Sequence, residues 1–209
     1  ERSGIDPAAI EEVVFAQSYA NSETSCVGRW IALSAGLPVE VPGFQIDRRC
    51  GGGLQAIVTA AMMVETGVCD VVLAGGVESM SRIEYYSMDM RWGKRSGTAQ
   101  FYDRLDRGRE PSQPVDRFGY ISGMIETAEN LAGDFAIGRE AADAYAAESH
   151  RRAAAAWDEG RFAEEVVPVS VPQKRGNAGP AKANHERRHR HRRQCGAAER
   201  CRGSLPGGG

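Results

Sequence analysis

The chain has 209 residues, of which 42% are hydrophobic and 26% are charged, and its formal net charge is −2. This length and composition suit a globular core of one large domain or two small ones. No apolar run approaches the length of a membrane span and no basic-then-apolar signal segment is present, so neither a membrane protein nor an exported one is predicted. The five irregularly spaced cysteines are then read as reduced thiols, and we expect a cytoplasmic protein.

Charge is distributed unevenly along the chain. Residues 177–209 carry eight Lys or Arg against two Asp or Glu, whereas residues 1–176 carry 18 against 26. We place a boundary near Gly176 and predict that 177–209 is a basic, disordered tail. Its Arg, Ala, Gly, His and Pro content is typical of out-of-frame translation of a GC-rich gene, and a nucleic-acid-binding tail is the alternative. Its His and Cys spacings match no common zinc pattern, so no metal site is expected.

Strand and helix patterns alternate in the first part of the chain. A helical end capped by Asp6 comes first, and the two helices that follow stop at Gly36 and Gly67. The expected elements are strand 13–17, helix 26–35, strand 44–47, helix 50–65 and strand 70–74. This order with short links predicts βαβ units, and hence an α/β fold with a parallel sheet.

Helix 50–65 and strand 70–74 are apolar on nearly every side. A helix of this kind is predicted to be buried on most of its surface, and the continuous apolar strand is predicted to be fully buried. The pattern is lost between Ser81 and Ser122, where basic residues form either a phosphate-binding surface or ordinary solvated loop charge, the reading that mixed signs favour. Further helices are expected over 122–133 and 139–160, and an edge strand over 166–171.

One cysteine stands at the junction between strand 44–47 and helix 50–65. Cys50 precedes three glycines, at a point where unpaired backbone N–H groups and the positive end of a helix dipole converge. That environment favours the thiolate, the form that attacks carbonyl carbon. The alternative is a small buried core residue. No general base is identified by spacing, because His150 lies in a charged helical stretch and reads as a solvated surface residue.

Three blocks of sequence resemble the thiolase family. Residues 47–56 (D-R-R-C-G-G-G-L-Q-A) resemble the acyl-enzyme motif N-x-x-C-G-S-G-L-Q-A, with Asp47 in place of Asn and Gly52 in place of Ser. Residues 74–81 (A-G-G-V-E-S-M-S) resemble A-G-G-x-E-[SN]-M-S, and residues 123–130 (G-M-I-E-T-A-E-N) resemble H-M-G-x-T-A-E-N. With three blocks in the right order, the chain is identified as a member of this family from about residue 3 to about residue 172.

The resemblance implies a fold and a division into domains. We expect a partial thiolase N-terminal domain over 1–81, with a parallel-type sheet and helices on both faces, and part of an inserted, substrate-covering loop domain over 82–176. In thiolases this sheet has five strands with the first at its centre; here that strand would precede Glu1 and leave three strands with a gap among them. The isolated chain is therefore expected to fold poorly, with exposed strand edges and apolar helix surface.

The resemblance also implies a reaction. Thiolases move an acyl group between coenzyme A thioesters, so Cys50 is expected to form the S-acyl intermediate and its N–H to supply part of an oxyanion hole. Met124 matches the motif methionine that lies beside the bound acyl group. Acyl-CoA and coenzyme A are the expected partners, with no cofactor, no membrane, no nucleic acid, and a dimer or tetramer as in the family.

Several family features are absent from these 209 residues. Gly123 and Ile125 replace the usual His and Gly of the third block, and no G-H-P histidine, N-E-A-F segment or C-x-G cysteine in its usual setting occurs. Family members are roughly twice as long, so an incomplete chain of doubtful activity is expected. A ketoacyl-synthase-type condensing enzyme remains an alternative, against which the 78–81 block argues. A non-catalytic interaction or nucleic-acid-binding protein that uses the basic tail is another.

Removal of residues 177–209 is expected to leave the melting behaviour of the chain unchanged. These residues lack the apolar surface that would offset the entropy of ordering, on the order of 1–2 kcal/mol per residue for the backbone alone. Melting curves of the 1–176 and 1–209 chains, followed by circular dichroism, test this expectation. A clear loss of stability on truncation would show that the tail packs against the rest.

Overall fold

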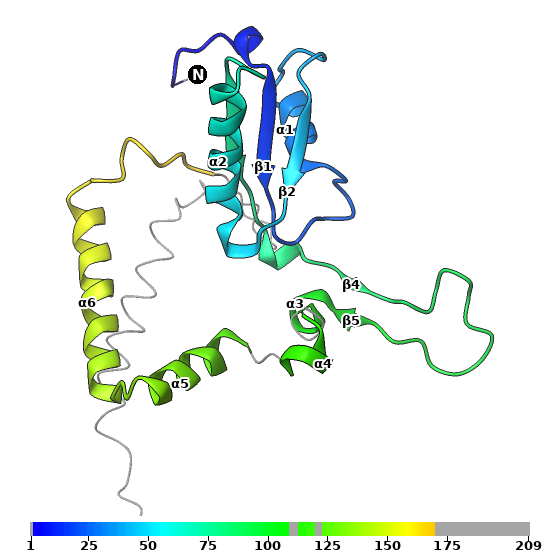
Figure 1. Ribbon diagram of the computed structural model, residues 1–209, viewed down its shortest axis with the longest axis vertical. Coiled ribbons are helices and arrows are strands. Elements are labelled where there is room, and N and C mark those ends of the chain that lie inside the picture. Colours follow the sequence, from blue (N-terminus) through cyan, green and yellow to red (C-terminus); the bar gives the residue numbers. More distant parts are fainter. Residues whose placement is uncertain (1, 109–112, 120–122, 170–209) are drawn as a thin grey trace, which may run out of the picture. The chain divides into compact units, whose positions relative to one another are not determined.

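A computed structural model describes residues 2–108, 113–119 and 123–169 of the chain (Figure 1). The chain divides into two compact units between Gly123 and Met124, and each is described by itself. The basic tail and the last two residues of the expected edge strand lie outside the described residues. The predicted domain boundaries after residues 81 and 176 stay predictions.

A parallel sheet of three strands forms the centre of the first unit. The strands are β1 (Glu12–Ala16), β2 (Gly43–Ile46) and β3 (Val72–Gly76), in the order β2-β1-β3. β1 pairs with both neighbours, so that Val14 lies opposite Phe44 on one side and Ala74 on the other. The predicted parallel sheet is confirmed. The predicted gap is wrong, because β1 itself occupies the centre and pairs along both edges.

One helix packs on each face of this sheet (Figure 1). The two helices are α1 (Val27–Ser34) and α2 (Gly52–Glu65). Because side chains alternate along β1, Val13 packs with Ala32 of α1 whereas Val14 packs with Ala56 of α2. The crossover through α1 runs from β1 to β2, and the crossover through α2 runs back from β2 past β1 to β3. Because the two run in opposite directions, right-handed connections put their helices on opposite faces. The α/β fold with helices on both faces is confirmed.

α2 is far less buried than its composition predicts. Its buried residues are the small ones, Gly52, Ala56 and Ala60, whereas the side chains of Leu54 and Ile57 are 68% and 59% exposed. No residue of β3 is buried either. The predictions of nearly complete burial are therefore wrong for this chain by itself, because three strands cover only one face of α2. The exposed apolar surface expected on this helix is confirmed.

The other described elements of the first unit are short. They are the 3₁₀ turns η1 (Pro7–Ala9), η2 (Arg49–Gly51) and η3 (Met80–Arg82), the antiparallel pair β4 (Tyr85–Tyr86) and β5 (Tyr102–Asp103), and the single turns α3 (Arg104–Arg107) and α4 (Val115–Phe118). Basic side chains here pair with nearby carboxylates, in the pairs Arg82–Glu23, Lys94–Asp89 and Arg104–Glu84. These pairings favour ordinary loop charge over a phosphate-binding surface.

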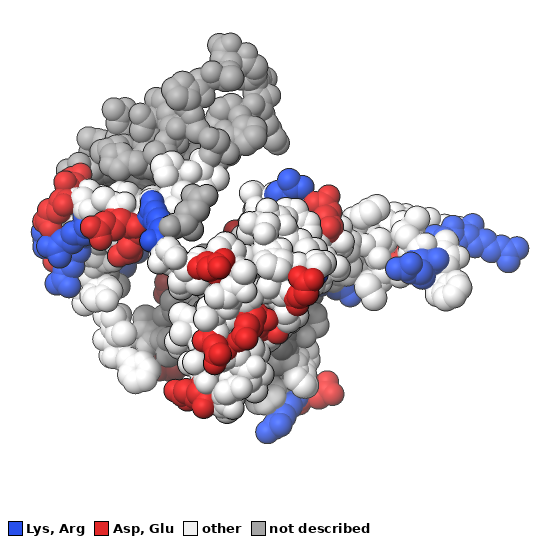
Figure 2. Space-filling view, turned by 90° about the horizontal axis from the view of Figure 1, so that it is seen from above, with Lys and Arg blue, Asp and Glu red and all other residues white. Residues whose placement is uncertain are grey.

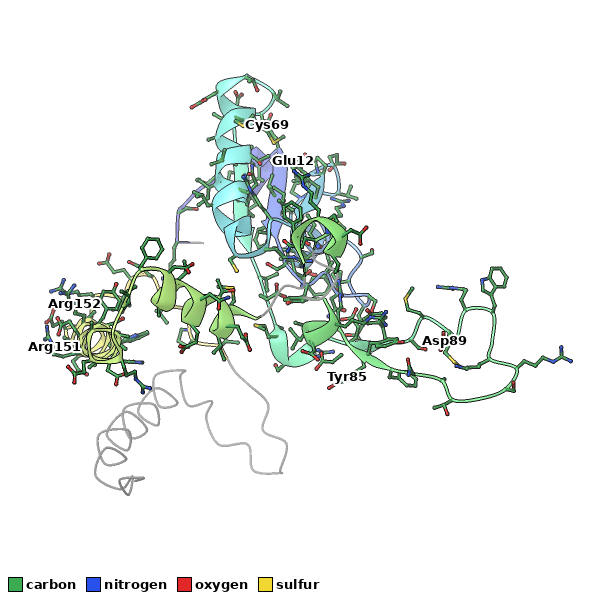
Figure 3. All side chains as sticks on the ribbon, turned by 60° about the horizontal axis from the view of Figure 1, so that its bottom comes forward. Glu12, Cys69, Tyr85, Asp89, Arg151 and Arg152 are labelled. Carbon is green, nitrogen blue, oxygen red and sulfur yellow. The ribbon has the colours of Figure 1, made fainter. Side chains whose placement is uncertain are left out.

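In the described part of the second unit, residues 124–169, the chain forms two helices as predicted, α5 (Met124–Asp134) and α6 (Arg139–Asp158). On α6, Glu148 accepts hydrogen bonds from Arg151 and Arg152, both labelled in Figure 3, and these bonds lower the pKa of Glu148 to about 2. His150 is exposed, as predicted. Residues 166–169 form no strand; the predicted edge strand is wrong there, because the sequence pattern supplies no partner strand. None of the described helices is long and apolar enough to cross a membrane.

Ile57→Gln is expected to raise the soluble fraction of the 1–209 chain, whereas Ala56→Gln is expected to lower it. Ile57 is exposed, and its neighbour Ala56 is fully buried against Val14. The exposed exchange removes apolar surface and changes stability by about 0.5 kcal/mol at most, whereas the buried exchange overpacks the core at a cost of about 1–3 kcal/mol. Soluble yield after centrifugation compares the two variants. An equal loss of soluble protein in both would contradict the exposure of Ile57.

Candidate active site

The carboxyl ends of the three parallel strands meet at one edge of the sheet. Residues 17–19 follow β1, residues 47–51 follow β2 and residues 77–79 follow β3. Ligands of open α/β sheets bind outside the carboxyl ends of the strands, where the direction of the connections reverses. Here the connection from β1 leads to β2 on one side, and the connection from β2 returns past β1 to β3 on the other side. Cys50 lies in the loop that follows β2.

Cys50 is exposed and belongs to the 3₁₀ turn η2. The sequence predicted that the helix begins at Cys50, but α2 begins two residues later, at Gly52. The thiol therefore precedes the helix. The N–H of Gly51 donates to the backbone oxygen of Arg48 at 3.0 Å, and the N–H of Gly52 donates to that of Arg49. These two N–H groups are therefore already paired within the turn. The alternative of a buried core cysteine is wrong.

Gly52 lets α2 start in contact with the central strand. A Cβ atom added at position 52 would lie 3.0 Å from Cβ of Ala16, closer than the optimal carbon–carbon separation of about 3.5–4.0 Å. A serine, which the thiolase motif carries here, therefore requires a small shift of one backbone against the other. The glycine fixes how closely the Cys50 turn approaches the end of β1.

Asp47 and Arg49 shape the turn that carries Cys50. Oδ1 of Asp47 accepts the backbone N–H of Arg49 at 3.0 Å, and Oδ2 lies 3.4 Å from Nη1 of Arg49. Arg49 has φ +47°, in the left-handed region that residues other than glycine rarely adopt. Its Nη1 donates to the backbone oxygen of Ser18 at 2.6 Å, and its guanidinium lies 5.6 Å from the ring centre of Tyr19. The residue before Cys50 is thus tied to the loop after β1.

Glu78 ties the same loop to the end of β3. Its Oε2 accepts the backbone N–H of Ser18 at 2.8 Å and that of Tyr19 at 3.2 Å. The three loops at this edge are therefore joined through residues 18 and 19. Sequence reasoning singled out Glu78 only as a motif residue, and it missed Ser18 and Tyr19, for which the sequence carries no signal. Asp47 two residues before Arg49 is a recognisable signal for a local side-chain-to-backbone turn.

The two other described cysteines are less accessible than Cys50. Cys26 is the residue before α1 and is half-buried, and its Sγ donates a hydrogen bond to the backbone oxygen of Gly43 at 3.5 Å rather than to the helix. Cys69 is buried at the amino edge of the sheet, near Glu12 (Figure 3). Burial raises the pKa of the Cys69 thiol, and Glu11, Glu12 and Asp70 raise it further. Figure 2 looks onto this end of the sheet, where acidic side chains gather.

Met124 belongs to the second unit, where it is the first residue of α5 and its side chain is 79% exposed. Its contact with a bound acyl group stays a prediction. In the part of the chain that the structure describes, no group of three or more His, Cys, Asp and Glu residues could hold a metal ion. The first unit contains no histidine at all, since residues 1–123 of the sequence have none.

Comparison with known proteins assigns the chain to a family. Residues 1–194 match the family described as Thiolase, N-terminal domain. The chain is 39% identical over 170 residues to a beta-ketoadipyl-CoA thiolase of Acinetobacter baylyi, covering 81% of this chain and 42% of the relative. It is 38% identical over 178 residues to an acetyl-CoA acetyltransferase of Chromobacterium violaceum, covering 85% and 44%.

A solved structure supports the same assignment. The crystal structure of the Bacillus anthracis acetyl-CoA acetyltransferase matches with a TM-score of 0.74 and 36% identity, over 84% of this chain and 43% of that one. The chain therefore belongs to the thiolase family, and it spans less than half the length of the curated relatives it matches. The family match to residue 194 overlaps the first part of the predicted tail.

Cys50 is expected to react with iodoacetamide faster than Cys26 and Cys69 in the folded chain. Cys50 is exposed, Cys26 is half-buried, and Cys69 is buried with a raised pKa, which lowers its thiolate fraction. Brief labelling under native conditions followed by peptide mapping gives the order of reaction. Labelling in urea should remove the differences in access. Equal labelling of the three thiols without denaturant would contradict the greater accessibility of Cys50.

Proposed function

We propose that this chain supplies the nucleophile of a thiolase-type acyltransferase, an acetyl-CoA acyltransferase or acetyltransferase. The observation that carries the proposal is an exposed cysteine held in a defined turn at the carboxyl edge of a parallel sheet, in a chain of the thiolase family. The relatives named acetyl-CoA acetyltransferase and beta-ketoadipyl-CoA thiolase support acyl-CoA thioesters as the substrate class. Coenzyme A is then the second substrate, with no further cofactor.

The first step is attack of the Cys50 thiolate on the thioester carbonyl carbon. A new S–C bond forms, the bond from that carbon to the sulfur of coenzyme A breaks, and coenzyme A leaves as a thiol after it takes up a proton. The acyl group then sits on Sγ of Cys50. In the second step the α-carbon of a second acetyl-CoA, after loss of a proton, takes the acyl group and returns the thiolate. With a 3-ketoacyl-CoA the thiolate attacks the 3-keto carbon instead, the bond from that carbon to the α-carbon breaks, and acetyl-CoA leaves after its α-carbon takes up a proton. Coenzyme A then takes the acyl group from Cys50. The N–H of Cys50 is the proposed donor to the carbonyl oxygen.

The isolated 1–209 chain carries few of the groups that such a reaction needs. Its sequence holds no G-H-P histidine, and none of its cysteines stands in the setting of the family's C-x-G motif. The charge effect of a helix end is worth about 0.3–2 kcal/mol, whereas one positioned acid or base contributes about 10²–10⁴-fold in rate. We therefore infer slow acylation of Cys50 without turnover. Further parts of the proposal are Met124 beside the acyl group, a homo-oligomer, and a reducing cytoplasmic location for the free cysteines.

Acetyl-CoA is expected to acylate Cys50 slowly in the 1–209 chain, without measurable formation or cleavage of acetoacetyl-CoA. Both can be measured on one sample, by the mass of the Cys50 peptide and by thioester absorbance. Cys50→Ala is the control that should abolish acylation. A Cys50 that iodoacetamide labels but acetyl-CoA never acylates would sink the proposed function. Turnover that survives purification and disappears in Cys50→Ala would contradict the inference that the 1–209 chain lacks groups needed for turnover.

A further inference from the structure

We propose that Glu78 and Arg49 are positioning residues for Cys50, and that they act together through one peptide group between Ser18 and Tyr19. The inference rests on the proposed function of Cys50 as the nucleophile. Neither side chain needs to touch the substrate. Together they fix where the Cys50 turn stands relative to the central strand.

The peptide group between Ser18 and Tyr19 is held at both ends. Its N–H, on Tyr19, donates to Oε2 of Glu78 at 3.2 Å, and its carbonyl oxygen, on Ser18, accepts from Nη1 of Arg49 at 2.6 Å. In a trans peptide the N–H and the C=O point in opposite directions. Glu78 therefore holds this group from the side of β3 while Arg49 holds it from the side of β2. Both are charge-assisted hydrogen bonds, which are stronger than neutral ones.

Arg49 transmits this restraint to Cys50 because it is the preceding residue. Its backbone has the left-handed φ of +47°, a conformation that persists where surrounding contacts fix it. Its N–H is bound by Oδ1 of Asp47, and its side chain is bound by Oδ2 of Asp47 and the Ser18 carbonyl. With backbone and side chain both held, the direction in which the chain enters Cys50 is set by the loop after β1.

The opposite edge of the sheet provides a matched control. There Oε2 of Glu11 accepts the backbone N–H of Asp70 at 2.5 Å, so that another glutamate links the start of β1 to the residues before β3. This bond joins the same two strands at the edge that does not carry Cys50. Loss of the Glu11 bond reports what a strand-to-strand link contributes to stability. Only the Glu78 bond is expected to affect the nucleophile.

The experiment compares Glu78→Ala, Glu78→Gln and Glu11→Ala in the 1–209 chain. Glu78→Ala is expected to slow acylation of Cys50 by acetyl-CoA by about ten- to a hundredfold, the scale of loss that follows a misplaced reacting group. Glu78→Gln keeps an acceptor oxygen for both N–H groups and should restore most of the rate. Glu11→Ala should leave the acylation rate close to that of the unaltered chain. Unchanged iodoacetamide labelling of Cys26 shows in each sample that the fold persists.

Arg49→Gly separates the backbone of Arg49 from its side chain. Glycine adopts a positive φ without strain, so a purely conformational role predicts an unchanged or faster acylation. The positioning role predicts a loss similar to that of Glu78→Ala, because the guanidinium is gone. The two losses should not add in the double variant, since both residues act on the same peptide group. If Glu78→Ala does not fold, the acylation rates of Arg49→Gly and Glu78→Gln still test the positioning role.

Hydrogen exchange gives a readout that needs no acyl transfer. The hydrogen bonds of Glu78 go to Ser18 and Tyr19, so an effect on the Cys50 turn has to pass through them. Glu78→Ala should speed amide exchange in peptides that cover residues 48–53, and Glu11→Ala should not. If the unaltered chain is never acylated but this exchange changes, the proposed function fails and the positioning role stands. If the unaltered chain is acylated and Glu78→Ala changes neither its acylation nor this exchange, the positioning role is overturned.

Discussion

The central position of β1 is the constraint on which the rest of the first unit depends. Its two large, fully buried side chains, Val13 and Val14, face opposite sides of the sheet, and each begins a separate small core. α1 packs on the core around Val13, and α2 packs on the core around Val14. Since α2 follows directly from the Cys50 turn, the burial of Val14 against Ala56 fixes the sheet face against which the helix after that turn packs.

Elements marked by local signals could be predicted from the sequence. The helix that follows Cys26 and stops at Gly36, and the helix that stops at Gly67, lie within two residues of their predicted ends. Burial could not be predicted in the same way, because it depends on what covers a surface. α2 is apolar all round, yet its small residues meet the sheet and its large ones face outward. The predicted edge strand near Pro168 failed for a related reason, since an extended run forms a strand only where a partner exists.

In the candidate site, too, residues close together in the sequence could be predicted, whereas contacts between residues far apart in the sequence could not. Cys50 and its glycines could be found because they are neighbours in sequence and resemble a known motif. The hydrogen bond from Arg49 to Ser18 joins residues 31 apart, and that from Ser18 to Glu78 joins residues 60 apart. No propensity or spacing rule connects such residues. The left-handed backbone of Arg49 was also missed, because such a conformation is usually predicted from a glycine and Arg49 is not one. The one local signal in the sequence is Asp47, whose side chain accepts the N–H of Arg49.

The contacts that hold the Cys50 turn differ in kind from those that hold the sheet. The sheet is held by buried valines and alanines, whereas the turn is held by hydrogen bonds and one ion pair between exposed groups. Local opening has its own free energy, which is lowest where few apolar atoms are buried. Ionic strength screens the Asp47–Arg49 pair but leaves the valine cores untouched. The edge that carries Cys50 can therefore open while β1 and its two helices remain folded, so the position of the Cys50 turn responds to salt separately from global unfolding.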